Sequence, residues 1–173
     1  FSRIHPSKNL HKLIKLWKSD KFFYKYSLSV FGEITDLNYF KKLFYRSETN
    51  FKNIKYFGPL KKNLQKTLSK YDVFVMPSKS ENFGLVVLEA LSSGLFVLVN
   101  KDLPWKILER NHLGKSFVMN KKNLIYSIKK IELIKNKIRK KNYKNKIFNF
   151  LNTNYSWNKI VKIYISNYHS LVK

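Results

Sequence analysis

Short apolar runs alternate along the chain with segments in which apolar side chains recur every three or four positions. Four apolar residues near the start have the spacing of a single helix face: Leu10, Leu13, Ile14 and Trp17. Ser7 precedes them at a place suited to capping this helix. The same period predicts further helices over residues 37–44, 60–70, 83–93 and most of 121–173.

The runs between these helices favour strands, which we expect over residues 26–31, 54–57, 72–76, 95–99 and 116–119. The third and fourth are continuous apolar runs, typical of strands buried on both faces of a parallel sheet. Their alternation with helices predicts right-handed βαβ units. The predicted fold class is therefore α/β, with a doubly wound, Rossmann-like parallel sheet in about residues 1–120, additional C-terminal helices in 121–173, and one domain over 1–173.

Composition changes this picture little. The chain of 173 residues carries 35 Lys plus Arg against 10 Asp plus Glu, a formal net charge of +25. Lysine and asparagine have A/T-rich codons and the chain has a single alanine, so codon bias accounts for much of the lysine excess. Strong positive charge attracts nucleic acid, anionic lipid and phosphorylated substrates alike, and by itself indicates none of them.

Several classes of protein are excluded or disfavoured. The chain has no cysteine, which excludes disulfides and thiolate metal sites. The four histidines (His5, His11, His112 and His169) have no metal-ligand spacing, so we expect no metal and no cofactor. No apolar run approaches the roughly 20 residues of a membrane helix, and no secretory signal opens the chain. We expect a soluble, cytoplasmic domain.

The densest candidate chemistry lies in residues 76–94, where a buried strand leads through a polar loop into a helix. Free amides at a helix start bind anions, and Gly84 permits close approach of a phosphate there. Glu81 and Glu89 stand eight positions apart beside this start, where carboxylates that bind ribose or sugar hydroxyls are expected. The alternative is that neither glutamate binds a ligand. Glu81 would then only complement the dipole of the helix, and Glu89 would be a solvated surface side chain, which is the more common case for an isolated pair of glutamates.

The context favours the functional interpretation. Residues 77–94 resemble the Glu-x7-Glu signature of family 4 (group 1) retaining glycosyltransferases of the GT-B fold. Residues 2–8 look like the Arg-x4-Lys loop of that family, 53–60 like its base-binding turn, and 155–158 like the aromatic-Ser-Trp start of its final helix. A Pro-Trp loop at 102–105 is a weaker match. The resemblance spans nearly the whole chain and implies the C-terminal, donor-binding half of such an enzyme, without its N-terminal acceptor domain.

The resemblance implies roles residue by residue. Arg3 and Lys8 would neutralise the donor diphosphate and stabilise the leaving group, Glu81 would face the donor sugar, and these three form the expected catalytic set. The implied donor-binding residues are Glu89 at the ribose, the amides around Asn82, Phe83, Gly84 and Leu85, and the turn at Gly58 and Leu60. Asn9 stands where the family usually has glycine, and asparagine also tolerates unusual backbone angles.

The implied reaction is sugar transfer from a nucleotide-diphosphate sugar with retention of anomeric configuration, in the synthesis of envelope polysaccharide or lipopolysaccharide. Its partners would be the nucleotide sugar and the acceptor domain, and the chain alone is expected to be inactive. If the chain holds only the tail of its first strand, the sheet also lacks most of a central strand. A non-catalytic donor-binding subunit and a nucleotide-sugar epimerase stay open as alternatives; a specific nucleic-acid-binding module ranks last.

Two surface features complete the expectations. Residues 121–146 carry eleven basic residues against one acid and form an amphipathic helix with a basic face. An ordinary solvated surface explains such a face as well as attraction to anionic lipid or nucleic acid does. Of those two, peripheral contact with the inner face of an anionic membrane is favoured. The three tryptophans, Trp17, Trp105 and Trp157, are expected to pack between elements, with Trp105 alone in a loop that reaches the cleft.

Overall fold

The structure is a computed structural model that describes residues 1–45, 52–60, 62–138 and 140–171. Its strands are β1 (Leu28–Val30), β2 (Ile54–Tyr56), β3 (Val73–Met76), β4 (Phe96–Asn100) and β5 (Gly114–Phe117). Its α-helices are α1 (Leu10–Lys18), α2 (Leu37–Phe44), α3 (Leu64–Leu68), α4 (Leu85–Ser92), α5 (Ile107–Arg110), α6 (Lys121–Ile138), α7 (Lys141–Tyr155) and α8 (Trp157–Leu171). Two short 3₁₀ helices, Pro6–Lys8 and Lys21–Lys25, flank α1.

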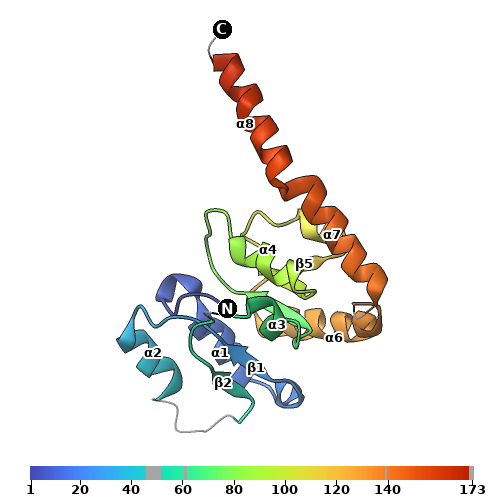
Figure 1. Ribbon diagram of the computed structural model, residues 1–173. Helices are drawn as coiled ribbons and strands as arrows, with labels where there is room; N and C mark the ends of the chain where they lie inside the picture. The colour runs from blue at the N-terminus through green and yellow to red at the C-terminus, as the bar shows by residue number, and fades with distance from the viewer. Residues whose placement is uncertain (46–51, 61, 139, 172–173) are drawn as a thin grey trace.

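All strand pairs are parallel, so the predicted α/β class with parallel strands is confirmed (Figure 1). Hydrogen bonding divides the strands into two groups, β1–β2 and β3–β4–β5. A lone parallel bridge, Ile4↔Ile34, attaches the N-terminal segment beside the end of β1. The carboxyl ends of these strands therefore lead into the loops where the candidate chemistry was expected.

The boundaries of several elements differ from the sequence expectations for local reasons. Ser7 does not cap α1, because it lies inside the 3₁₀ helix and Asn9, in a left-handed conformation, precedes α1 instead. The helix expected from residue 60 begins only at Leu64, after Asn63 has also taken left-handed angles. The last strand begins two residues before the expected residue 116, at Gly114, where an added Cβ would lie 2.5 Å from the Val97 carbonyl oxygen. The short α5 was not anticipated.

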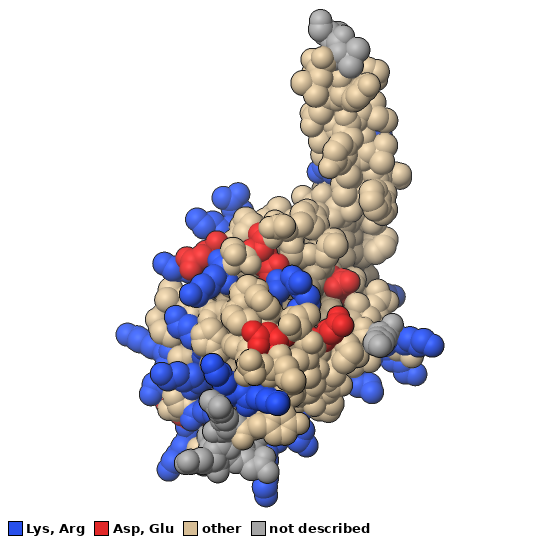
Figure 2. All heavy atoms as spheres, turned by 90° about the vertical axis from the view of Figure 1, so that its left-hand side faces the viewer, with Lys and Arg blue, Asp and Glu red and all other residues tan. Residues whose placement is uncertain are grey.

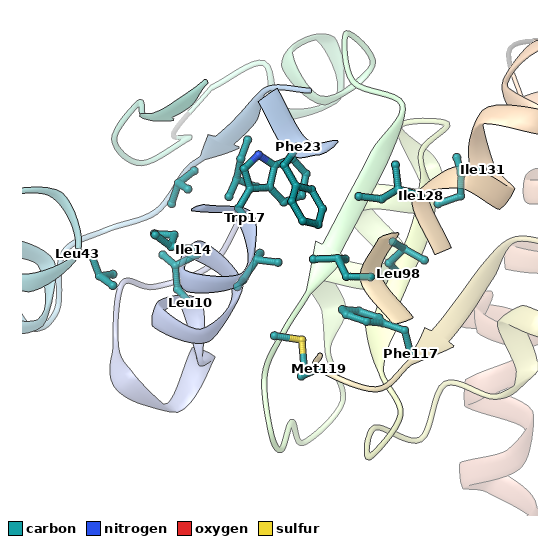
Figure 3. Close-up of a cluster of buried hydrophobic side chains, with 14 of the residues drawn as sticks. Leu10, Ile14, Trp17, Phe23, Leu43, Leu98, Phe117, Met119, Ile128 and Ile131 are labelled. Carbon is teal, nitrogen blue, oxygen red and sulfur yellow. The ribbon is translucent and has the colours of Figure 1, made fainter. Parts of the chain in front are cut away.

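The core consists of two clusters on opposite faces of the strands. The first, the α1–α6 cluster, joins side chains of α1 and Phe23 to those of β4, β5 and α6, as Figure 3 shows. The second, the α4–α7 cluster, packs α4 and α7 against the other face. All five residues of β4 are buried, with Leu98 in the first cluster and Val97 in the second, as the continuous apolar run predicts.

The C-terminal helices differ in how much of their surface is buried. The apolar face of α6 is buried in the α1–α6 cluster, and the expected basic helix of 121–146 divides between α6 and α7. Helix α8 buries none of its residues and projects from the body in Figure 1. Trp157, at its first position, is 80% exposed, so the expectation that it packs is wrong within this structure. No described helix combines the length and the apolar character needed to cross a membrane.

Lysine and arginine side chains spread over the body on the face shown in Figure 2, with acidic groups among them. Three lysines form ion pairs with acids across elements: Lys121 with Asp20, Lys25 with Glu132, and Lys135 with Asp72. Their charged atoms lie 3.1 to 3.4 Å apart. The basic surface of α6 is thus partly neutralised by the scarce acids of the chain.

Candidate functional site

The candidate site begins where β3 ends. A loop from Pro77 to Gly84 follows Met76, and α4 starts at Leu85. The Val87 amide already donates to the Gly84 carbonyl oxygen at 2.8 Å, whereas the amides of Leu85 and Val86, ahead of it, have no carbonyl one turn back in the helix. Gly84 has φ +69°, and an added Cβ there would lie 3.2 Å from the Trp105 indole nitrogen. Glycine is therefore required at this turn by the packing of Trp105 as well as by its backbone angles. The loop makes an anion site at the helix start geometrically available.

Trp105 does not reach the cleft as a lining residue. It is 4% exposed and belongs to the α4–α7 cluster, where it supports Gly84 from within. Its ring centroid lies 6.2 Å from that of Tyr155, which in turn stands edge-on to Phe83 at 6.0 Å. The expected role of Trp105 at the cleft is thus replaced by one beneath the loop.

Lys8 and Glu81 form an ion pair that joins two distant loops. The Lys8 Nζ lies 2.5 Å from Glu81 Oε1, and the two side chains are only 16% and 12% exposed. A small cavity of about 50 Å³ is lined by both residues together with Ser78. The structure thus brings together two of the three residues expected to be catalytic, with each charge neutralised by the other.

Two buried asparagines hold the backbone of this loop. Asn9 donates from Nδ2 to the Pro77 carbonyl oxygen at 3.0 Å, and Asn100 donates from Nδ2 to that of Ser78 at 3.1 Å. Asn9 adopts the left-handed angles that the sequence analysis allowed for it, with φ 54°. Sequence reasoning missed Asn100, although a polar residue at the end of an all-apolar strand was a usable signal.

Replacement of Asn9 by alanine is expected to lower the free energy of unfolding by about 2–4 kcal/mol, because it leaves the partly buried Pro77 carbonyl unpaired and strains the backbone. Asn63→Ala is a matched control, since Asn63 has φ 55° and an exposed side chain without a capping bond. Its cost is expected to be about 1 kcal/mol. Urea denaturation of both variants measures the difference, and equal losses would show that the Pro77 contact contributes nothing.

The other expected residues lie along the same edge without joining the pair. Within the described part of the chain, no hydrogen bond or ion pair connects Arg3 or Glu89 to Lys8 or Glu81, and Arg3 is exposed. Glu89 is half-buried in α4.

The remaining donor-binding candidates divide between exposed and structural positions. Asn82, Phe83 and Leu85 are exposed around the helix start. Gly58 has φ +77° and its carbonyl oxygen accepts a hydrogen bond from the Gly32 amide at 2.9 Å. Leu60 packs partly buried against the α4–α7 cluster, so it supports the turn after β2 from below.

Gly32 supports the N-terminal segment that carries Arg3 and Lys8, and sequence reasoning did not single it out. The N-terminal segment crosses it so closely that an added Cβ would lie 1.6 Å from the Ser2 carbonyl oxygen. Hydrogen bonds from the Ser2 amide to Phe31 and from the Ile4 amide to Glu33 hold the crossing segment at 3.0 and 2.7 Å. A glycine directly after an apolar strand was the available signal.

The histidines and acids of the described chain form no group of three that could hold a metal ion. His5 is exposed, with its Nδ1 2.9 Å from the Ser7 hydroxyl, and caps the 3₁₀ helix, as a loop residue would. Metal-independent chemistry stays a prediction.

Parallel strands with a helix-packed cluster on each face, and polar loops after their carboxyl ends, define a Rossmann-like α/β domain. Residues 1–148 match the family model described as Glycosyl transferases group 1. The chain therefore belongs to the group 1 glycosyltransferases, as its motifs predicted. Membership of family 4 and the retaining mechanism stay predictions.

Solved structures agree with the fold. The structure of Anabaena Alr3699/HepE in complex with UDP has a TM-score of 0.76 and 19% identity, over 98% of this chain and 47% of that chain. The C-terminal domain of LpcC, a group 1 family protein of Francisella tularensis, has a TM-score of 0.67 and 23% identity, over 91% of this chain and 84% of that chain.

One curated relative matches over a short segment. The sulfoquinovosyl transferase SQD2 of Arabidopsis thaliana is 63% identical over 35 residues, which are 20% of this chain and 7% of the plant protein. The chain thus spans a small part of that relative and less than half of the Anabaena structure.

Proposed function

We propose that this chain binds the donor of a retaining glycosyltransferase, a nucleotide-diphosphate sugar, at the carboxyl edge of β3. The observation that carries the proposal is the meeting of Lys8 and Glu81 beside the free amides at the start of α4. One residue comes from the Arg-x4-Lys loop and the other from the Glu-x7-Glu segment. A cation, a carboxylate and a helix start are the groups that a diphosphate and a sugar require.

In this proposal the diphosphate lies against the amides of Gly84 and Leu85, and Lys8 exchanges its Glu81 partner for a phosphate oxygen. Arg3 approaches the same charge from the exposed side, and Glu89 accepts hydrogen bonds from the ribose hydroxyls. The released Glu81 carboxylate faces the sugar. Lys8 would thus have an anionic partner both before and after the donor binds.

The proposed chemistry breaks the bond between the anomeric carbon and the diphosphate oxygen, and the electron pair stays on that oxygen. Lys8 and Arg3 stabilise the charge that develops there, which is the main contribution of this chain. The acceptor hydroxyl forms the new bond on the same face of the sugar, and its proton passes to the departing diphosphate oxygen. The acceptor would be bound by a further domain, in the synthesis of envelope polysaccharide or lipopolysaccharide.

We also propose that the basic face of α6 makes peripheral contact with anionic lipid; the donor proposal does not depend on this contact.

Calorimetric titration with uridine, guanosine and adenosine diphosphates at two salt concentrations tests the donor site. One nucleotide is expected to bind best, with modest salt dependence, and Arg3→Ala is expected to weaken it about tenfold through loss of a charge-assisted contact. Arg110→Ala, at an exposed arginine of α5, is the matched control and should bind normally.

The proposal would be overturned if all three nucleotides bound equally, with strong salt dependence and no change in Arg3→Ala. Such binding would be non-specific attraction to the many lysines of the chain. Product analysis with the preferred donor then separates the reactions. A transferred glycoside with retained configuration supports the proposal, whereas free epimerised sugar would replace it with an epimerase.

A further inference from the structure

Trp105 places a buried hydrogen-bond donor directly beneath the loop that opens α4. Its side chain is 4% exposed, and its indole nitrogen, Nε1, has no hydrogen-bond partner within the described part of the chain. Nε1 is also the atom nearest to the position that a Cβ on Gly84 would take, at 3.2 Å. The indole nitrogen therefore lies against the turn at Gly84, the residue that immediately precedes α4.

A buried N–H group without an acceptor needs a physical reason. Leaving a buried donor unpaired costs free energy, and the great majority of such groups in proteins have a partner. The neighbours of Trp105 in the α4–α7 cluster are apolar side chains, among which phenylalanine would fill a similar space without that cost. The position of the N–H group supplies a reason, because only Gly84, which has no side chain, separates it from the start of α4.

The backbone holds Trp105 at this place from both sides. The Trp105 amide donates to the Leu103 carbonyl oxygen at 2.8 Å, and the Trp105 carbonyl oxygen accepts from the Leu108 amide at 3.0 Å. Its loop follows β4, the neighbour of β3, so the loops after two adjacent strands meet at the carboxyl edge. Asn100, the last residue of β4, adds a second link between these loops through its hydrogen bond to the Ser78 carbonyl oxygen. The indole thus has a fixed position beneath the loop.

The unpaired N–H group contributes positive potential at the start of α4. Its hydrogen carries a partial positive charge that no acceptor in the described chain offsets. The surroundings are apolar, and a low local dielectric strengthens the effect of such a dipole on a nearby charge. The first amides of α4, on Leu85 and Val86, act in the same sense together with the helix dipole. The indole and these amides therefore all favour an anion beside Gly84.

We propose that Trp105 is a positioning residue of the donor site, whose indole N–H supports the turn at Gly84 from beneath and adds a positive dipole under the free amides of α4. This inference rests on the proposed function, because it takes the start of α4 as the place of the diphosphate. Trp105 itself makes no contact with the donor: its side chain is buried, and it acts through the loop that touches the ligand.

Trp17 offers a matched control within the same chain. It is 5% exposed, and its indole nitrogen also has no hydrogen-bond partner among the described residues. It stacks on Phe23 in the α1–α6 cluster, at a centroid distance of 4.9 Å (Figure 3). Replacement of either tryptophan by phenylalanine removes one buried N–H group and part of one ring. Only the replacement of Trp105 removes them from beneath the candidate site.

The first measurement follows the indole N–H signals in a nitrogen–proton correlation NMR spectrum of the full chain. The chain has three tryptophans, and Trp17→Phe, Trp105→Phe and Trp157→Phe assign their signals by the loss of one signal each. Titration with the preferred nucleoside diphosphate is expected to shift the Trp105 signal along the saturation curve that calorimetry gives, and to leave the Trp17 signal in place. If Trp105→Phe does not fold, the other two variants assign its signal by elimination.

The second measurement compares that nucleoside diphosphate with its nucleoside, which lacks the phosphates. Trp105→Phe is expected to weaken binding of the diphosphate about fivefold to twentyfold and of the nucleoside less than about twofold, because the indole acts on the charge of the phosphates. Trp17→Phe should change neither affinity by more than about twofold. A purely structural defect of the loop would weaken both ligands alike.

The proposal would be overturned by a Trp105 signal that stays in place at saturating nucleotide. Equal losses of nucleoside and diphosphate affinity in Trp105→Phe, or an equal loss of diphosphate affinity in Trp17→Phe, would also overturn it. If the three nucleotides bind equally and Arg3→Ala changes nothing, the donor proposal fails and this inference fails with it. If one nucleotide is preferred and Arg3→Ala weakens it while the Trp105 signal stays in place, only this inference fails.

Discussion

Replacement of Glu89 by glutamine is expected to weaken binding of the preferred nucleoside diphosphate by about 10–100-fold, because the carboxylate would lose charge-assisted hydrogen bonds to the ribose hydroxyls. Glu89 lies in α4, four residues after its first residue, Leu85, and is half-buried, whereas Glu81 precedes the helix in the loop. Glutamine has nearly the same shape, so the change removes charge and one acceptor while leaving the packing of α4 in place. Calorimetric titration gives the ratio of dissociation constants directly.

Glu132→Gln is the matched control for this prediction. Glu132 lies on α6, where it pairs with Lys25 at 3.1 Å on an exposed surface. Its replacement should leave nucleotide affinity within twofold of the original. Unchanged affinity in Glu89→Gln, or an equal loss in Glu132→Gln, would remove Glu89 from the donor site and leave only a general effect of negative charge.

Gly32→Ala is expected to be the most damaging single methyl addition for stability. Its Cβ would lie 1.6 Å from the Ser2 carbonyl oxygen, so the N-terminal segment must move and give up its hydrogen bond to Phe31. Forced overpacking together with an unfavourable φ of 156° is expected to cost about 3 kcal/mol. In a chain of this size that lowers Tm by about 6–12 °C, measured by calorimetry or circular dichroism.

Gly58→Ala is the control that separates the cost of a steric clash from the cost of unfavourable backbone angles. Gly58 also has positive φ, at +77°, but an added Cβ there meets nothing within 4 Å. Its cost is expected to be about 1–2 kcal/mol, from backbone angles alone. If Gly32→Ala and Gly58→Ala have the same Tm, the close crossing of the N-terminal segment over Gly32 does not exist in solution.

Much of the fold could be predicted from the sequence, because a strand that is buried on both faces appears as a continuous run of apolar residues. The all-apolar run at β4 and the alternation of strands with helices predicted parallel pairing correctly. Errors arose where the local backbone overrode periodicity. The left-handed turns at Asn9 and Asn63 delay their helices, and no periodic signal reports such turns. Trp157 begins the last helix as its motif predicts, yet it is exposed, since amino-acid type does not reveal whether a neighbour covers it.

The sequence predicted which residues belong to the candidate site but not the contacts between them. Glu81 was expected at the carboxyl edge of the sheet because it follows a buried strand, and Lys8 was expected there because residues 2–8 resemble a loop of the family. Their ion pair depends on two loops 73 residues apart in sequence, which no local pattern specifies. The support from Asn100 and the crossing at Gly32 are likewise long-range contacts.

The joint between α7 and α8 lies next to the candidate site. α8 leaves the body after one extended residue, Ser156, and its 15 residues reach about 22 Å outward. Tyr155, the last residue of α7, stands edge-on to both Phe83 and Phe150. One aromatic ring thus connects the end of α7 to the loop that opens α4, and a substitution at Tyr155 is expected to disturb both.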